Sequence, residues 1–273
     1  MIQGSYEFLP QNRIIDGTPA AEAVCATADQ QNAKRVFIVS SQTPSRNTAE
    51  VDKIRAALGD RFIGLPDECG AHVPRENVMT AAAGVRAANP DLIVTIGGGT
   101  PIDTGKVLLI VMAEGIKTAA QPGEYRIRVL ENGSRHVPIV KAPSLRRVIV
   151  PTTVPGTEFN NLAGCSNPER KVKDLHTGRL IGAQVVILDP AVTIHTPEWF
   201  WLSTGIRAGD DRRKNDVCRC PLGTITMSTR DILRLLLGEW ACTTLPRHRA
   251  DCGRSRVCRR RGRRHNRTAR AAV

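Results

Sequence analysis

The feature that most constrains the fold is a run of three glycines between a predicted strand and a predicted helix. Asp91–Ile96 is rich in β-branched residues, and Gly97, Gly98 and Gly99 follow it directly. Glycine lets the backbone turn sharply and approach a ligand closely, because no Cβ intervenes. The free N–H groups and the dipole of the helix that follows favour a phosphate. The strand, glycine and helix context therefore favours phosphate binding.

The start of this helix can also be explained without a ligand. Thr100 is a good N-cap, Pro101 suits the first helical position, and Asp103 would complete a capping box. Capping accounts for these three side chains, but it does not account for three successive glycines, which cost conformational entropy. We expect the helix to run from Thr100 to about Ala113.

Strands and helices alternate along the first 200 residues. Short connections between them predict an α/β domain with a parallel sheet covered by helices on both faces. The dipeptide Asn132-Gly133 predicts a hairpin between Tyr125–Leu130 and His136–Val140. The other expected elements are strands at Val36–Ser40, Asp91–Ile96, Arg147–Val150 and Gln184–Leu188, and helices at 47–58, 76–88, 100–113 and from Pro197 onward.

Two further groups of side chains are candidates for ligand contacts. Thr152 and Thr153 follow a predicted strand, and open α/β sheets bind ligands at the carboxyl ends of their strands. Taken alone, a Thr-Thr pair followed by Pro155-Gly156 is equally typical of an ordinary turn. Lys173 could supply positive charge beside a bound ligand, although an exposed lysine is more often simply solvated.

The net charge of +13 is concentrated in the last part of the chain. Residues 1–211 contain 22 Lys and Arg and 22 Asp and Glu, whereas residues 212–273 contain 17 and 4. The second segment has almost no hydrophobic period, and we expect residues 247–273 to be disordered. The sequence therefore divides into a dinucleotide-binding domain over 1–196, the start of a second domain over 197–211, and a basic tail over 212–273.

Taken together, the motifs resemble the iron-containing alcohol dehydrogenase family, in its maleylacetate-reductase-like branch. The resemblance spans roughly Phe8 to Ala208. It implies a Rossmann-like parallel-sheet domain that binds NAD or NADP, and an all-helical domain that carries iron or zinc. The motifs that carry it are Gly97–Lys106, Pro151–Thr153, Val186–Pro190 and Leu202–Ala208.

The resemblance also assigns roles to individual residues. Gly97, Gly98, Gly99 and Thr100 would hold the pyrophosphate, and Asp103 would lie near the ribose and the nicotinamide. Thr152 and Thr153 would contact the nucleotide. Lys173 would lie beside the nicotinamide ribose. Ser40 and Ser41 occupy the ribose-contacting region; since neither is acidic, the choice between NAD and NADP stays open.

The metal site of the family is where this sequence departs from the pattern. Arg207 stands where the family has a metal-binding Asp, and Asp211 stands where it has a His. A guanidinium stays protonated and cannot bind a cation. Maleylacetate-reductase-like members resemble this chain in having Gly-Ile-Arg-Ala, so Arg207 would instead contact a substrate carboxylate or oxygen. We expect no intact metal site.

The basic tail has three competing explanations. The favoured one is a frameshift near residue 209, since out-of-frame translation of a GC-rich gene gives Arg-rich sequence with scattered Cys and His; the helical domain would then be largely missing. A nucleic-acid-binding arm is second, but Trp240 alone offers little stacking surface. A zinc site is third, and the spacing of Cys218, Cys220 and Cys252 does not match the usual pairs.

These observations predict an oxidoreductase that transfers hydride between a nicotinamide and a small alcohol, aldehyde or keto acid. We expect this chain to be impaired or inactive. The alternative is a nucleotide-binding remnant whose basic tail associates with nucleic acid, without catalysis. No apolar run is long enough for a membrane span and no signal peptide is visible, so we expect a cytoplasmic protein, with a homodimer possible and nucleic acid an unfavoured partner.

Overall fold

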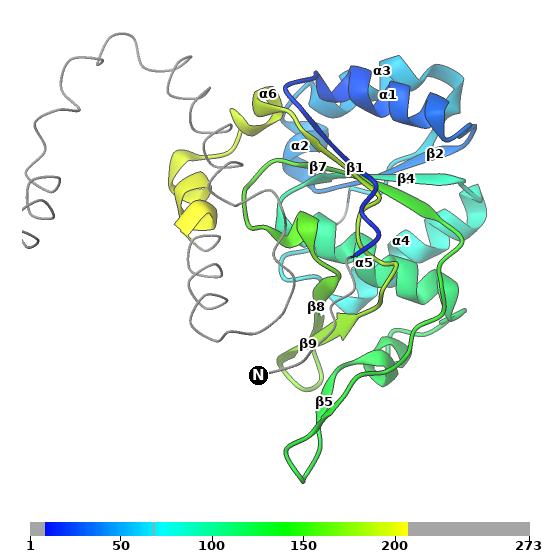
Figure 1. Cartoon of the computed structure of the whole chain (residues 1–273), viewed down its shortest axis with the longest axis vertical. Coiled ribbons are helices and arrows are strands. Elements are labelled where there is room, and N and C mark those ends of the chain that lie inside the picture. Colours follow the sequence, from blue (N-terminus) through cyan, green and yellow to red (C-terminus); the bar gives the residue numbers. More distant parts are fainter. Residues whose placement is uncertain (1–8, 68, 207–273) are drawn as a thin grey trace, which may run out of the picture. The chain divides into compact units, whose positions relative to one another are not determined.

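The computed structural model describes residues 9–67 and 69–206. Its centre is a six-stranded sheet in the order β1-β10-β7-β4-β2-β3, in which every neighbouring pair is parallel (Figure 1). This arrangement confirms the predicted parallel α/β domain. The strands are β1 (Arg13–Asp16), β2 (Val36–Ser40), β3 (Phe62–Gly64), β4 (Leu92–Gly97), β7 (Arg146–Pro151) and β10 (Val185–Leu188).

Helices cover both faces of this sheet. Figure 1 shows α1 and α3 on one side and α4 and α5 on the other. Two short helices, α2 and α6, follow β2 and β10, and residues 198–206 are also helical. The helix bounds are α1 (Ala20–Gln30), α2 (Gln42–Arg46), α3 (Glu50–Leu58), α4 (Arg75–Ala88), α5 (Gly99–Ala113) and α6 (Pro190–Thr193), with short 3-10 turns η1 (Gly59–Arg61), η2 (Gln121–Tyr125) and η3 (Thr157–Phe159).

Side-chain alternation along the central strands divides the core into two layers. In β2, Ile38 belongs to the layer under α1 and α3, whereas Phe37 and Val39 belong to the layer over α4 and α5. All five residues of β2 are buried, which is why the strand reads as a continuous apolar run. The carboxyl ends of β2, β4 and β7 are thereby fixed side by side.

Two small antiparallel sheets lie outside the central one. The predicted hairpin at Asn132-Gly133 is confirmed, although its strands are shorter than expected: β5 is Arg128–Val129 and β6 is Arg135–His136. Gly133 has a φ of +77°, which glycine adopts without strain. The second hairpin, β8 (Leu162–Asn167) and β9 (Val172–Thr177), was not predicted, and β8 packs against α5.

The predicted cap of α5 is wrong. The helix begins at Gly99, its N-cap is Gly98, and no side chain caps it. Thr100 is therefore inside the first turn, and the Asp103 carboxylate is engaged in contacts with other elements.

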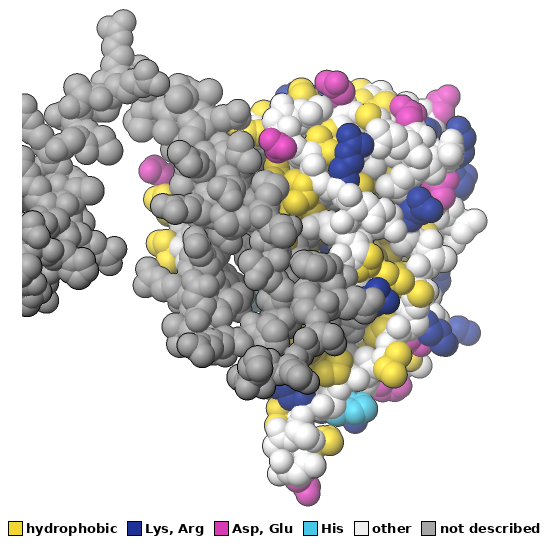
Figure 2. All heavy atoms as spheres, in the orientation of Figure 1, with side chains coloured by type: hydrophobic (Ala, Val, Ile, Leu, Met, Phe, Trp, Pro, Cys, Tyr) yellow, Lys and Arg dark blue, Asp and Glu magenta, His cyan; other side chains and the backbone are white. Residues whose placement is uncertain are grey.

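The surface of the described domain carries charges of both signs. Figure 2 shows Lys and Arg interspersed with Asp and Glu over the visible face, as the balanced composition of residues 1–211 leads one to expect. Within the ranges that the structure describes, no helix combines the length and the apolar character needed to cross a bilayer.

Candidate cofactor-binding site

The three glycines form the turn from β4 into α5. Gly97 has a φ of +138°, which a residue with a side chain rarely adopts. A Cβ placed on Gly98 would lie 3.0 Å from the Thr153 hydroxyl oxygen, whereas one on Gly99 would meet nothing closer than 3.9 Å. The turn is thus closed toward β7 at Gly98 and open at Gly99, where helix α5 presents its free N–H groups. No acidic side chain lies in the first turn to offset the helix dipole.

Thr152 and Thr153 lie beside this turn, as predicted. The Thr152 N–H donates to the Gly97 carbonyl at 3.0 Å, which continues the pairing of β7 with β4 past the end of the strands. Thr153 is buried, and its hydroxyl has no hydrogen-bond partner among the described residues. A buried hydroxyl at a glycine turn is a ready contact for a ligand oxygen.

Ser40 and Ser41 end β2 and point in different directions. The Ser40 hydroxyl is buried and donates to the Ile96 carbonyl at 3.2 Å, so it ties β2 to β4. Ser41 lies beside the glycine turn, since its hydroxyl is 3.2 Å from a Cβ placed on Gly97. Of the two serines, Ser41 is the one available to a ligand.

A cavity of about 120 Å³ joins several of the predicted residues. Ser41, Gly98, Thr152 and Thr153 line it at the ends of three neighbouring strands, and apolar side chains that follow β10 close its far side. It is smaller than the roughly 300–1,000 Å³ of sites that enclose a whole ligand. It is therefore large enough for only part of a ligand at the glycine turn.

Asp103 holds protein segments together at the edge of this site. Its carboxylate accepts from the Thr157 hydroxyl at 2.8 Å and from the Gly164 N–H at 3.2 Å. Lys106, one turn later in α5, lies 3.4 Å from the same carboxylate. The structure thus places Asp103 between α5, η3 and β8.

Lys106 is fully buried, and sequence reasoning gave it no role. Its ammonium donates to the Thr157 carbonyl and hydroxyl and to the Leu162 carbonyl, each at 2.7 Å, and to the Asn160 side chain at 2.9 Å. Burial lowers the pKa of Lys106 to about 8, and Asp103 opposes that shift. This lysine fastens the segment that follows Thr153.

Two more buried charges near α5 were also missed. Arg147, in β7, packs against Gly105, and its guanidinium has no hydrogen-bond partner in the described part of the chain. Burial lowers its pKa to about 9, which leaves it charged at neutral pH. Burial raises the pKa of Glu158 to about 7. The one feature of the sequence that could have indicated a buried Arg147 was Gly105, a glycine inside a helix, where the missing side chain leaves room for the guanidinium.

Lys173 lies in β9, outside the cavity. Its aliphatic chain runs across Gly164, the residue whose N–H binds Asp103. The neighbouring Asp174 is buried and pairs with Arg75 of α4 at 2.6 Å, which fixes β9 against the domain. The structure therefore brings Lys173 close to Asp103 but not to Ser41.

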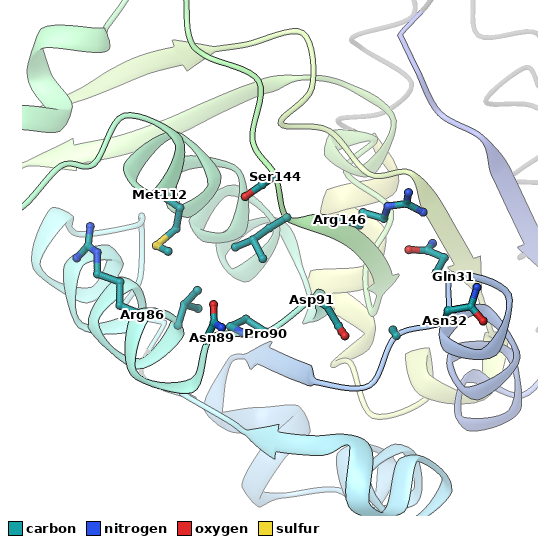
Figure 3. A pocket seen from close by; sticks show the side chains of 12 residues that line it. Gln31, Asn32, Arg86, Asn89, Pro90, Asp91, Met112, Ser144 and Arg146 are labelled. Carbon is teal, nitrogen blue, oxygen red and sulfur yellow. The ribbon is translucent and has the colours of Figure 1, made fainter.

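A larger cavity of about 600 Å³ lies at the opposite ends of the strands (Figure 3). Asn89, Pro90 and Asp91 precede β4 there, and Ser144 and Arg146 lie at the start of β7. Ligands of open α/β sheets bind at the carboxyl ends of the strands. The smaller cavity, which contains the glycine turn, is accordingly the candidate site.

The predictions for a metal and for Arg207 fall largely outside the described residues. Positions 207 and 211 are not among them, nor is the basic segment 212–273. Within 9–67 and 69–206, no group of three or more His, Cys, Asp or Glu side chains could hold a metal ion.

Comparison with known proteins agrees with this geometry. Residues 10–190 match the family model described as iron-containing alcohol dehydrogenase. The chain belongs to that family, as its motifs predicted. A dehydrogenase of Gibberella moniliformis, FUM7, is 33% identical over 202 residues, covering 71% of this chain and 46% of the relative. A maleylacetate reductase of Sphingobium indicum is 27% identical, covering 76% and 48%. The chain spans about half the length of the curated relatives it matches.

Solved structures share the fold. A 1,3-propanediol oxidoreductase superimposes with a TM-score of 0.63 at 25% identity, over 75% of this chain and 51% of that one. A sulfoacetaldehyde reductase from Bifidobacterium kashiwanohense, solved in complex with NAD⁺, also gives a TM-score of 0.63, at 17% identity, over 76% and 52%. The Rossmann-like architecture predicted from the sequence is therefore confirmed.

Proposed function

We propose that this chain binds NAD(H) or NADP(H) at the carboxyl ends of β2, β4 and β7, as part of an oxidoreductase acting on a small alcohol, aldehyde or keto acid. The observation that carries the proposal is the glycine turn, closed at Gly98 by Thr153 and open at the start of α5. The unpartnered Thr153 hydroxyl at that turn fits a phosphate oxygen.

Each residue of the site has a part in this proposal. Gly97, Gly98 and Gly99 would hold the pyrophosphate through their N–H groups, with Thr100 in the first turn behind them. Thr153 would bind a phosphate oxygen, and Thr152 and Ser41 would bind the adenosine side. When bound, the nicotinamide supplies or accepts the hydride. Asp103 and Lys106 would keep the η3 segment in place, and Lys173 would face the nicotinamide end from β9.

The metal of the family has no place in this proposal. Arg207 replaces a metal-binding Asp of the family, and a guanidinium cannot bind a cation. We propose that Arg207 contacts a carboxylate or carbonyl oxygen of the substrate, and that turnover by this chain is low or absent. Incubating the purified chain with NADH and maleylacetate, with and without added zinc, tests this; robust oxidation of NADH would contradict it.

We also propose the domain division that the sequence suggested. Residues 1–196 form the dinucleotide-binding domain, residues 197–211 begin the helical substrate domain, and residues 212–273 are a basic segment without counterpart in the family. The match of the family model to residues 10–190 supports the first part.

Titration with NADH tests the binding site directly. Gly98→Ala places a Cβ 3.0 Å from the Thr153 hydroxyl, so we expect NADH binding, followed by nucleotide fluorescence, to weaken about tenfold or more. Gly182→Ala is the matched control, because its Cβ would meet only the Asn160 carbonyl at an ordinary 3.6 Å. If both variants bind NADH like the wild type, the glycine turn does not hold the cofactor.

A further inference from the structure

The cavity beside the glycine turn contains one acidic side chain among the described residues that line it. Glu50, the first residue of α3, is only 8% exposed, yet it lines the same cavity as Ser41 and Gly98. At the end of β2, where an acidic residue would contact the ribose, the sequence has only Ser40 and Ser41. The structure brings an acidic side chain, Glu50, to the same cavity from helix α3.

The contacts of Glu50 leave part of its carboxylate available. Lys53 donates to Oε1 at 2.8 Å, and the His195 Nε2 lies 3.5 Å from the same oxygen. In the described part of the chain, the second oxygen, Oε2, accepts no hydrogen bond. The Lys53 side chain is 60% exposed and does not line the cavity. The cavity therefore presents a carboxylate oxygen, and the Lys53 ammonium lies outside it while the His195 ring lines it.

The position of Glu50 suits the sugar of an adenine nucleotide. The Glu50 N–H donates to the Thr48 hydroxyl at 3.3 Å, so the start of α3 is fixed beside the cavity. Val192, Pro197 and Phe200 give part of the cavity wall an apolar character suited to a flat base, and His195 of the same segment reaches Glu50. A pyrophosphate at Gly98 would direct the attached ribose into the cavity that Glu50 also lines.

We infer that Glu50 makes this site select NAD(H) over NADP(H). A carboxylate accepts hydrogen bonds from the 2′- and 3′-hydroxyls of the adenosine ribose, and it repels a 2′-phosphate. This inference rests on the proposed nucleotide-binding function and names the residue that decides between the two cofactors.

The test is a titration of the full chain with NADH and with NADPH, followed by nucleotide fluorescence. The wild type is expected to bind NADH at least about tenfold more tightly, the size of one charge-assisted hydrogen bond. Glu50→Gln keeps the size of the side chain and removes its negative charge, which weakens its attraction for Lys53. We expect this variant to bind NADH more weakly and NADPH more tightly than the wild type does. The ratio of the two dissociation constants should come to within about threefold of one.

Two further variants make the result decisive. Asp52→Asn removes a charge from the same helix at an exposed side chain outside the cavity, and it should keep the wild-type ratio. Glu50→Asp keeps the carboxylate and should retain most of the preference. Thermal melting checks that Glu50→Gln folds. If it does not, Glu50→Asp is titrated with the two nucleotides in its place.

The outcomes separate this inference from the function on which it rests. A wild type that binds neither nucleotide overturns both the function and the role of Glu50. A wild type that binds NADPH as well as NADH keeps the function and overturns the role of Glu50. A Glu50→Gln variant with an unchanged ratio also overturns it.

Discussion

The two faces of the central sheet are built from different chemistry. Under α1 and α3, the strands contribute aliphatic side chains such as Ile38, Val94 and Val148. Over α5, the same strands and the helix bury Arg147 and Lys106, two cations in a layer made mostly of apolar groups. Burying a charge is costly unless it is paired and hydrogen-bonded. The charged face must therefore be maintained by contacts that the apolar face does not need.

The difference indicates what each face is for. The apolar face supplies hydrophobic stabilisation, and among the described residues its strands bury no charged side chain there, although Glu50 is buried at the start of α3. On the charged face, Lys106 binds three residues of the segment that leaves β7 after Thr153, and Asp103 binds β8. The site at the strand ends is thus fastened from the charged face, so disturbing the two faces should have different consequences.

Removing Lys106 should have the largest effect. Lys106→Met fills a similar volume but removes the ammonium that pairs with Asp103 and donates to the carbonyls of Thr157 and Leu162. Because breaking a buried ionic network costs about 3–5 kcal/mol, we expect a loss of that order in urea unfolding. Ile38→Val, on the apolar face, should cost only about 0.5–1.5 kcal/mol. Equal losses would remove the distinction between the faces.

Glu158 should give the charged face a pH dependence. Its folded pKa is raised to about 7 by burial, from an ordinary value of 4.5, so the folded state binds the proton more tightly than the unfolded state. The resulting stability is present below pH 4.5 and is lost as the pH rises toward and through 7. By linkage this amounts to about 3 kcal/mol.

Urea unfolding between pH 4.5 and 7.5 measures this dependence. Glu158→Gln cannot titrate, and we expect its profile to lack the decline shown by the wild type. Glu22→Gln removes an exposed carboxylate from α1, on the apolar side, and should follow the wild-type profile. Parallel profiles for the wild type and Glu158→Gln would show that this carboxyl is ionised in the folded state.

Replacing Arg147 on the charged face should make the folded protein more stable. Its guanidinium is fully buried without a hydrogen-bond partner in the described residues, so Arg147→Met should stabilise the protein by about 1–3 kcal/mol. A Cβ on Gly105 would lie 2.9 Å from both Arg147 Nη1 and Thr95 Oγ1, so Gly105→Ala alone should destabilise.

The double variant sharpens this expectation. With Met at position 147, the flexible side chain gives way and only the Thr95 contact remains, so the helical preference of Ala, up to about 1 kcal/mol over Gly, offsets more of the cost. A double-mutant cycle should therefore show favourable coupling between the two positions. Strict additivity would mean that Gly105 does not exist to accommodate the arginine.

The apolar face was largely predictable from the sequence, and the charged face was not. Strands β2, β4, β7 and β10 are recognisable in the sequence because parallel strands buried on both faces give continuous β-branched runs. Strand β1 was missed because Arg13–Asp16 has charged ends and only four residues. Hairpin β8–β9 was missed because it alternates buried and exposed positions irregularly.

The site residues divide in the same way. The glycine turn and Thr153 follow directly from strand ends, and the structure brings them together as expected. Asp103 was read as a local cap because its actual partner, the Gly164 N–H, is 61 residues away. Glu50 lacked any signal, since its approach to Ser41 depends on how α2 and α3 fold back on the strand end.

The sheet order also bears on how the chain is made. Strand β1, almost the first segment of the domain to emerge from a ribosome, pairs with β10, whose residues follow about 170 positions later. At roughly 5–20 residues per second, β1 waits about 10–30 s for its only strand partner in the sheet. During that interval Ile14 and Ile15 have no strand partner and β7 is an open edge of the growing sheet, so the nascent chain, rather than the finished protein, is the form most exposed to mispairing and most dependent on chaperones.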